Sequence, residues 1–157
     1  MKKLMLLAGL YCLQPSLHAT SGNPNAKHET VPMSATERAK ANFRENYAWV
    51  QDAAWFNTGD DNIYCIFHQG NIVNRVFYNQ RGYWQYTLIN YPASVLSKEM
   101  KERVQSSFPG YQIGYINEIR SDNFEPVYII SIENENNIKV VRMSGDELEV
   151  KQVLEKS

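Results

Sequence analysis

Residues 63–91, IYCIFHQGNIVNRVFYNQRGYWQYTLINY, contain three apolar and aromatic runs that are separated by two polar turns. β-Branched and aromatic residues dominate these runs, and this is the composition that β-strands favour. The turns contain Gly70 and Gly82, each with an asparagine close by, which is typical of hairpin connections. The stretch therefore predicts three consecutive antiparallel strands. The predicted strands are Ile63–His68, Ile72–Tyr78 and Tyr83–Tyr91.

Helix signals lie on both sides of this stretch. Ser34 and Glu37 have the spacing of a capping box, and apolar residues follow at every fourth position, which predicts a helix over Ala35–Asn46. Ser94 can cap a second helix over Val95–Phe108, where a Pro-Gly pair stops it.

A second set of strand-like runs follows the second helix. These runs are Tyr111–Ile119, Val127–Ile132, Ile138–Met143 and Leu148–Leu154. The order of elements resembles that of the first half, so we predict an α+β fold of two repeated helix-plus-antiparallel-sheet units, at about 34–92 and 93–155. The helices are expected to pack on one face of the sheet. Chance similarity between two α+β halves is the alternative.

The N-terminus has the layout of a secretory signal peptide. Two lysines precede a short apolar run, and Ala19 offers a small residue at the cleavage position. We therefore predict a signal peptide at 1–19, a flexible leader at 20–33 and one domain at 34–157. The apolar run is too short to span a bilayer, so no stable membrane span is expected after cleavage. The predicted location is the bacterial periplasm or the exterior of the cell.

Composition excludes several classes of protein. The chain has 157 residues, 43% of them hydrophobic, which is too apolar for a disordered chain. Sixteen basic against 17 acidic residues give a net charge of −1, which argues against nucleic-acid binding. Cleavage after Ala19 would leave Cys65 as the only cysteine, so no internal disulfide is expected.

No catalytic, metal-binding or cofactor-binding pattern is found in the sequence. Cys65 and His68 are three residues apart on one predicted strand, so their side chains point to opposite faces. We expect Cys65 to be a buried core residue. Two histidines and one cysteine in the mature chain have no recognisable zinc spacing. The sequence therefore predicts a protein that is not an enzyme and holds no cofactor.

Aromatic residues are more abundant in the first half than one buried sheet face requires. Exposed Tyr and Trp on a rigid sheet are good material for a protein-binding surface. Coverage by loops, or isolated exposed rings without function, is the alternative. The candidate surface is Trp55, Tyr78, Trp84 and Tyr86, with Tyr83 and Tyr91 as the fallback if the other face is open.

Several short motifs resemble a known family. The run Gly82–Thr87 leads through Tyr91-Pro92 into a helix, and Phe108–Tyr111 reads Phe-Pro-Gly-Tyr. A strand at Val127–Ile132 and a turn at Ser144–Asp146 follow. This order is similar to that of the PepSY-like, β-lactamase-inhibitor-like family of small exported bacterial proteins. The resemblance implies two helix-plus-sheet units with an open sheet face that grips an enzyme or inhibits a peptidase.

Together these observations predict an exported, non-enzymatic protein-binding module, such as an inhibitor of a periplasmic or extracellular enzyme. Its partner would be another protein, either an exported enzyme or a peptide. The alternatives are a small exported hydrolase or ligand-binding protein whose site forms only in three dimensions, and a structural component of the envelope.

Overall fold

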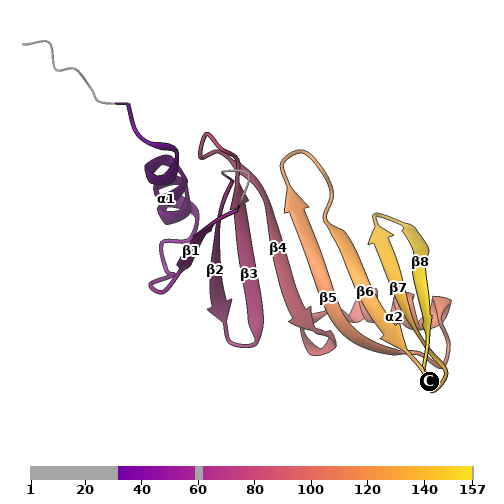
Figure 1. Ribbon diagram of the computed structural model, residues 1–157. Helices are drawn as coiled ribbons and strands as arrows, with labels where there is room; N and C mark the ends of the chain where they lie inside the picture. Colours follow the sequence, from indigo (N-terminus) through magenta and orange to yellow (C-terminus); the bar gives the residue numbers. More distant parts are fainter. Residues whose placement is uncertain (1–31, 59–61, 157) are drawn as a thin grey trace, which may run out of the picture. The chain divides into compact units, whose positions relative to one another are not determined.

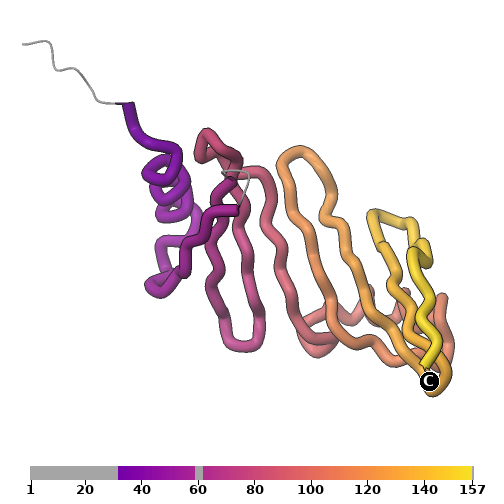
Figure 2. Tube along the Cα trace, in the orientation of Figure 1, coloured from indigo at the N-terminus to yellow at the C-terminus, as the bar shows by residue number. Residues whose placement is uncertain are grey.

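The computed structural model describes residues 32–58 and 62–156. In this part of the chain, eight strands form one antiparallel sheet in the order of the sequence (Figure 1, Figure 2). The strands are β1 (Ala54–Asn57), β2 (Ile63–Gln69), β3 (Ile72–Tyr78), β4 (Trp84–Pro92), β5 (Gln112–Ser121), β6 (Val127–Glu133), β7 (Asn137–Ser144) and β8 (Glu147–Glu155). The helices are α1 (Ala35–Asn46), the 3₁₀ turn η1 (Ala93–Val95) and α2 (Lys98–Ser107). Short connections join β2 to β3, β3 to β4 and each pair from β5 to β8, whereas a segment that contains a helix joins β4 to β5.

The prediction of an α+β fold with two repeated helix-plus-sheet units is wrong. β4 and β5 pair without interruption from Tyr86↔Ser121 to Pro92↔Tyr115, so one sheet continues across the predicted boundary between residues 92 and 93. The described chain is mainly β. The physical reason is that two separate sheets would each leave an edge with unpaired N–H and C=O groups. The segment that contains α2 instead returns the chain to the β4 edge, where β5 satisfies those groups.

The capping signals locate one helix well and the other less well. Helix α1 has the predicted bounds, and the Glu37 N–H donates to Ser34 Oγ at 3.2 Å while the Ser34 N–H donates to Glu37 Oε2 at 2.9 Å. The Ser34 N–H and, at 2.8 Å, the Ser34 hydroxyl both donate to the Glu37 carboxylate, and these two bonds lower its pKa. The second helix is shorter than predicted, because Ser97 rather than Ser94 caps it by accepting from the Met100 N–H at 3.2 Å.

Both helices lie against the same face of the sheet. In α1, Ala39 and Phe43 pack with the first strands, and in α2, Val104 packs with the later ones. Directly opposed residues in an antiparallel sheet share a face, and the register links Val76 of β3 to Thr87 of β4 and Arg120 of β5. We call this side the helix face and the other side the open face.

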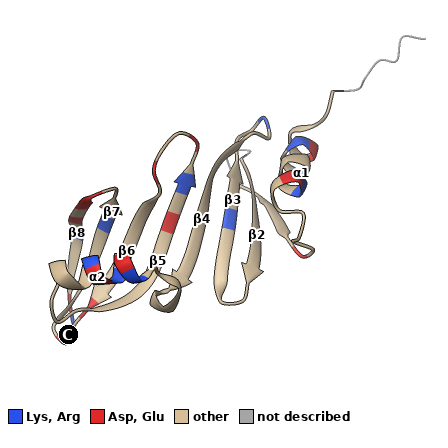
Figure 3. Ribbon diagram, turned by 180° about the vertical axis from the view of Figure 1, so that it is seen from behind, with Lys and Arg blue, Asp and Glu red and all other residues tan. Residues whose placement is uncertain are grey.

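The core divides into two clusters along the helix face. The first cluster, under α1, contains Ile63, Cys65, Phe67, Val76 and Tyr78. The second, under α2, contains Tyr91, Leu96, Ile116, Ile130, Ile132, Val141 and Met143. Charged residues are frequent on the helices and at the hairpin ends, whereas β2–β6 carry few of them (Figure 3).

A glycine determines how α1 begins against the sheet. Gly82 ends the β3–β4 turn with φ +78°, and a Cβ at this position would collide with the carbonyl oxygen of Ala35. Arg38 strengthens the same junction, because its guanidinium donates to the Arg81 carbonyl. The start of α1 therefore rests directly on the backbone of the turn.

The predicted signal peptide (1–19) and all but the last two residues of the predicted leader (20–33) lie outside the described residues. Among the helices of the described part, none has the length and apolar character that a bilayer span requires.

Candidate functional site

Four aromatic rings form a continuous stack across the first four strands on the open face. Phe56, Tyr64, Phe77 and Tyr86 come one from each of β1 to β4, and we call them the aromatic ladder. Their successive ring centroids are 5.0, 5.4 and 4.5 Å apart, with interplanar angles of 19°, 18° and 19°. Phe56, at the sheet edge, is 41% exposed, and the other three rings are half-buried. Offset stacking at these distances is favourable beyond the area that it buries.

Strand register explains why these four residues meet. The pairs Phe56↔Tyr64, Tyr64↔Phe77 and Phe77↔Tyr86 are direct cross-strand neighbours. In β2 and β3 these residues alternate with core positions such as Cys65 and Val76, so a buried helix face forces the rings onto the open face.

The ladder borders an apolar row on the same face. Leu88 is opposite Ile119, and Ile119 is opposite Val127, so aliphatic side chains extend the surface toward β6. Arg75 lies beside the ladder, between Ile66 and Leu88. Within the described residues, the open-face positions of β2–β5 include no aspartate or glutamate.

Three of the four sequence-predicted surface residues lie on the helix face, and Trp55 and Tyr78 are two of them. Tyr78 has no exposed surface and belongs to the core under α1. Trp55 is half-buried and stacks on Tyr78 at 6.0 Å, with Phe43 at its edge and the Lys40 ammonium 5.7 Å from its ring centroid. Tyr78 is therefore not available to a partner, because it packs beneath α1.

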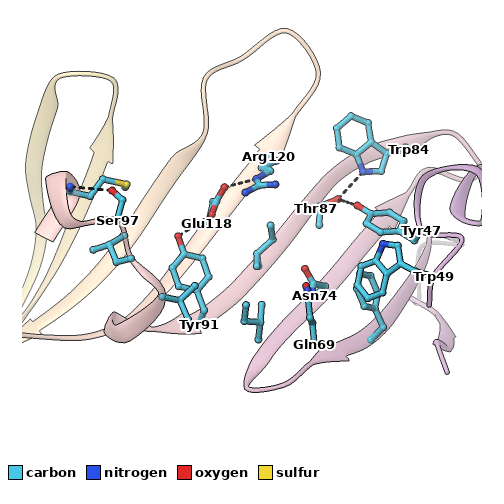
Figure 4. A pocket seen from close by; sticks show the side chains of 16 residues that line it. Tyr47, Trp49, Gln69, Asn74, Trp84, Thr87, Tyr91, Ser97, Glu118 and Arg120 are labelled. Carbon is cyan, nitrogen blue, oxygen red and sulfur yellow. Dashed lines mark hydrogen bonds and ion pairs between the residues drawn. The ribbon is translucent and has the colours of Figure 1, made fainter. Parts of the chain in front are cut away.

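Trp84 and Tyr86 were expected to share a face, and the structure separates them. Tyr78 is opposite Trp84 while Phe77 is opposite Tyr86, so β4 has one extra residue, Gln85, in a bulge. Trp84 turns to the helix face, where its indole N–H donates to Thr87 Oγ1 at 3.1 Å (Figure 4). Tyr86 alone of the four predicted residues lies on the open face.

The two fallback residues also lie away from the ladder. Tyr83 precedes β4, is 56% exposed and has the Arg38 guanidinium 5.1 Å from its ring centroid. Tyr91 is 6% exposed, and its hydroxyl donates to Glu118 Oε2 at 2.9 Å. Burial, followed by this hydrogen bond, raises the pKa of Tyr91.

Sequence reasoning missed Phe56, Tyr64 and Phe77. The signal that could have found two of them is the β2–β3 turn. Gln69 pairs with Ile72 across a two-residue connection at Gly70-Asn71. A turn of this length fixes the hairpin register, which places Tyr64 opposite Phe77.

The cysteine–histidine pair has no catalytic geometry. Cys65 is buried on the helix face, and burial raises the pKa of its thiol to about 12. His68 is opposite Val73 and is exposed on the open face. The predictions that Cys65 is buried and that the two side chains point apart are confirmed. Across residues 32–58 and 62–156, no three His, Cys, Asp or Glu side chains converge as metal ligands do.

Comparisons with known proteins relate the fold to that of several solved structures from Bacteroides. No family model matches the sequence, and no curated protein matches it. Among solved structures, a BLIP-like protein from Bacteroides fragilis has a TM-score of 0.61 and 12% identity, over 81% of this chain and 89% of that chain. A DUF2874 family protein from Bacteroides ovatus has a TM-score of 0.60 and 13% identity, over 75% of this chain and 85% of that chain.

A third solved structure of similar fold has a cellular location in its name. It is a candidate periplasmic protein from Bacteroides eggerthii, with a TM-score of 0.58 and 10% identity, over 76% of this chain and 87% of that chain. At these identities the likeness is one of fold. The β-lactamase-inhibitor-like part of the predicted resemblance is thus confirmed at the level of the fold, and the PepSY-like part stays a prediction.

Proposed function

We propose that the protein is an exported, non-enzymatic binding module that holds a protein partner on the open face of its sheet. The observation that carries this proposal is the aromatic ladder, four stacked rings on the face that neither α1 nor α2 contacts. Tyr64 and Phe77 each have a ring on both sides, so they lose little conformational entropy when a partner covers them. Anchors of this kind contribute most of the affinity in protein interfaces.

Charge narrows the chemistry of the partner. Arg75 lies beside the ladder on the open face, and the described open-face positions of β2–β5 carry no acid to neutralise it. A matching partner therefore presents an apolar contact with acidic side chains at its rim. An ion pair between Arg75 and such a side chain would be screened by salt, so the affinity should fall as the salt concentration rises.

The proposals of export and of an enzyme or peptide partner are supported by similar solved structures as well as by sequence motifs. The signal-peptide pattern of residues 1–19 and the candidate periplasmic protein from Bacteroides eggerthii support a location in the periplasm or outside the cell. The fold shared with a BLIP-like protein and the PepSY-like motifs support an exported enzyme or a peptide as the partner, with inhibition as the outcome of binding.

Affinity capture with matched variants tests this proposal. Protein that carries Tyr64→Ser and Phe77→Ser is compared with the wild type and with Tyr83→Ser, which removes a more exposed ring away from the ladder. We expect the ladder variant to bind the captured partner roughly thirtyfold more weakly, since two anchors are lost, and the control to bind normally. Equal capture by the ladder variant, once circular dichroism shows that it is folded, would contradict the proposal.

A further inference from the structure

The helix face contains a cavity that the aromatic ladder does not touch. Its volume is about 550 Å³. Strands β2–β5 form the floor, and Tyr47 and Trp49 form the wall on the α1 side (Figure 4). Leu96, which precedes α2, and Met100 of α2 also line the cavity. A cavity of this size is within the range of small-molecule sites.

One polar group on the floor has no partner among residues 32–58 and 62–156. Asn74 is 7% exposed, and its Nδ2 amide finds no hydrogen-bond acceptor among the described residues. The side chain stands between Tyr91 on one side and Trp49 on the other (Figure 4). Buried amide N–H groups in folded proteins are almost always bonded. This orphan donor therefore indicates an acceptor oxygen that the described residues do not supply.

The other two buried polar residues on the floor, Thr87 and Glu118, already have partners, and Gln69 at the end of β2 is exposed. Glu118, which is 4% exposed, accepts from the Tyr91 hydroxyl and pairs with the Arg120 guanidinium. Thr87 Oγ1 accepts from the Trp84 indole and lies 3.3 Å from the Tyr47 hydroxyl. Because Glu118 and Arg120 neutralise each other, an ionic ligand would lose its hydration without gaining a free counter-charge.

We propose that this cavity binds an uncharged small molecule that has an apolar ring and a carbonyl or hydroxyl oxygen, which accepts a hydrogen bond from Asn74. Asn74 and Glu118 are each opposite Ile89, so the row across β3, β4 and β5 is polar, apolar and polar. The ring of the ligand would lie over Ile89 and against the aromatic wall. This site is on the opposite face from the proposed protein-binding surface, so failure of one proposal would leave the other unaffected.

Three small probes of similar shape test the proposal by nuclear magnetic resonance titration of the ¹⁵N-labelled protein. Acetophenone carries the acceptor oxygen, ethylbenzene lacks it, and benzoate adds a negative charge. We expect saturable shifts of the Asn74 side-chain amide signals with acetophenone, and an affinity about fivefold to tenfold above that for ethylbenzene. Stronger binding of benzoate than of acetophenone would overturn the uncharged ligand class, and no saturable shift with acetophenone would overturn the site.

Two matched variants test whether Asn74 causes the preference for acetophenone over ethylbenzene. In Asn74→Leu the preference for acetophenone over ethylbenzene should disappear. In Asn90→Leu the same change is made on the open face, where Asn90 bonds to Asn117 at 3.0 Å, and the preference should stay within twofold of the wild type. An unchanged preference in folded Asn74→Leu would overturn the proposal. If Asn74→Leu does not fold, the Asn74 amide shifts in the wild-type protein decide the question.

Discussion

Two buried tyrosines offer a direct test of the hydrogen bonding on the helix face. Tyr78 has no exposed surface, and its hydroxyl has no hydrogen-bond partner in the described chain. Tyr91 is almost as buried, but its hydroxyl donates to Glu118 Oε2 at 2.9 Å. Replacement by phenylalanine removes the same single oxygen at both positions. The structure predicts opposite signs for the two changes in stability.

The size of each change in the free energy of unfolding follows from whether the tyrosine hydroxyl has a hydrogen-bond partner. A buried hydroxyl without a partner costs about 1–3 kcal/mol, so Tyr78→Phe should raise the free energy of unfolding by about 1 kcal/mol. The stack on Trp55 at 6.0 Å would be kept, because the ring is unchanged. A hydrogen bond to a charged group contributes about 1.5–3 kcal/mol, so Tyr91→Phe should lower the free energy of unfolding by about 2 kcal/mol.

Urea unfolding followed by tryptophan fluorescence measures both variants against the wild type. The expected gap between them is about 3 kcal/mol, and Tyr78→Phe should raise Tm by roughly 3 °C. Equal destabilisation by the two substitutions would refute the reasoning, because it would mean that the Tyr78 hydroxyl has a partner of similar strength.

Three further changes test the packing of the helix face and its junction with α1. Cys65 should resist thiol reagents in the native protein at pH 8 and react only on unfolding, because it is buried and its pKa is raised to about 12. Since this folded-state pKa exceeds the ordinary 9.0, the stability that Cys65 contributes is complete below pH 9 and is lost as the pH rises toward 12. Alkaline unfolding of Cys65→Ala against the wild type would measure this loss. Gly82→Ala should cost well over 2 kcal/mol in urea unfolding, since its Cβ meets the carbonyl of Ala35, whereas Gly70→Ala, with φ +61° and open space, should cost only about 1 kcal/mol. Ser34→Ala should lower the free energy of unfolding by about 1 kcal/mol through loss of the capping box, and an unchanged value would mean that α1 is held by packing alone.

Local signals in the sequence predicted most of the secondary structure. The capping box at Ser34 placed α1 at its observed bounds, because the bonds involved span only three residues. Turn residues likewise placed the strands from β2 onward to within a few positions. The prediction of how these elements assemble into sheets was wrong. Whether β4 ends one sheet or pairs with β5 depends on the path of the intervening segment in space, and no local pattern encodes that path.

The candidate site was predicted only in part, for two reasons. Strict alternation along β4 puts Trp84 and Tyr86 on the same face, but the bulge at Gln85 reverses one of them. Alternation also cannot tell which of two faces α1 covers, so Tyr78 was assigned to a surface that is in fact core. The excess of aromatic residues was real, and the ladder of Phe56, Tyr64, Phe77 and Tyr86 accounts for part of it.

Site-specific photo-crosslinking in the producing cell tests most directly whether the open face binds a partner. A photoreactive phenylalanine is placed at Phe56, which is 41% exposed within the ladder, and separately at Tyr83, which is 56% exposed outside it. Probes at both sites meet solvent, so accessibility alone would favour Tyr83. We predict a discrete covalent adduct with one protein from position 56 and none from position 83. Adducts of equal yield from both positions, or from position 83 alone, would contradict the open face as the binding surface.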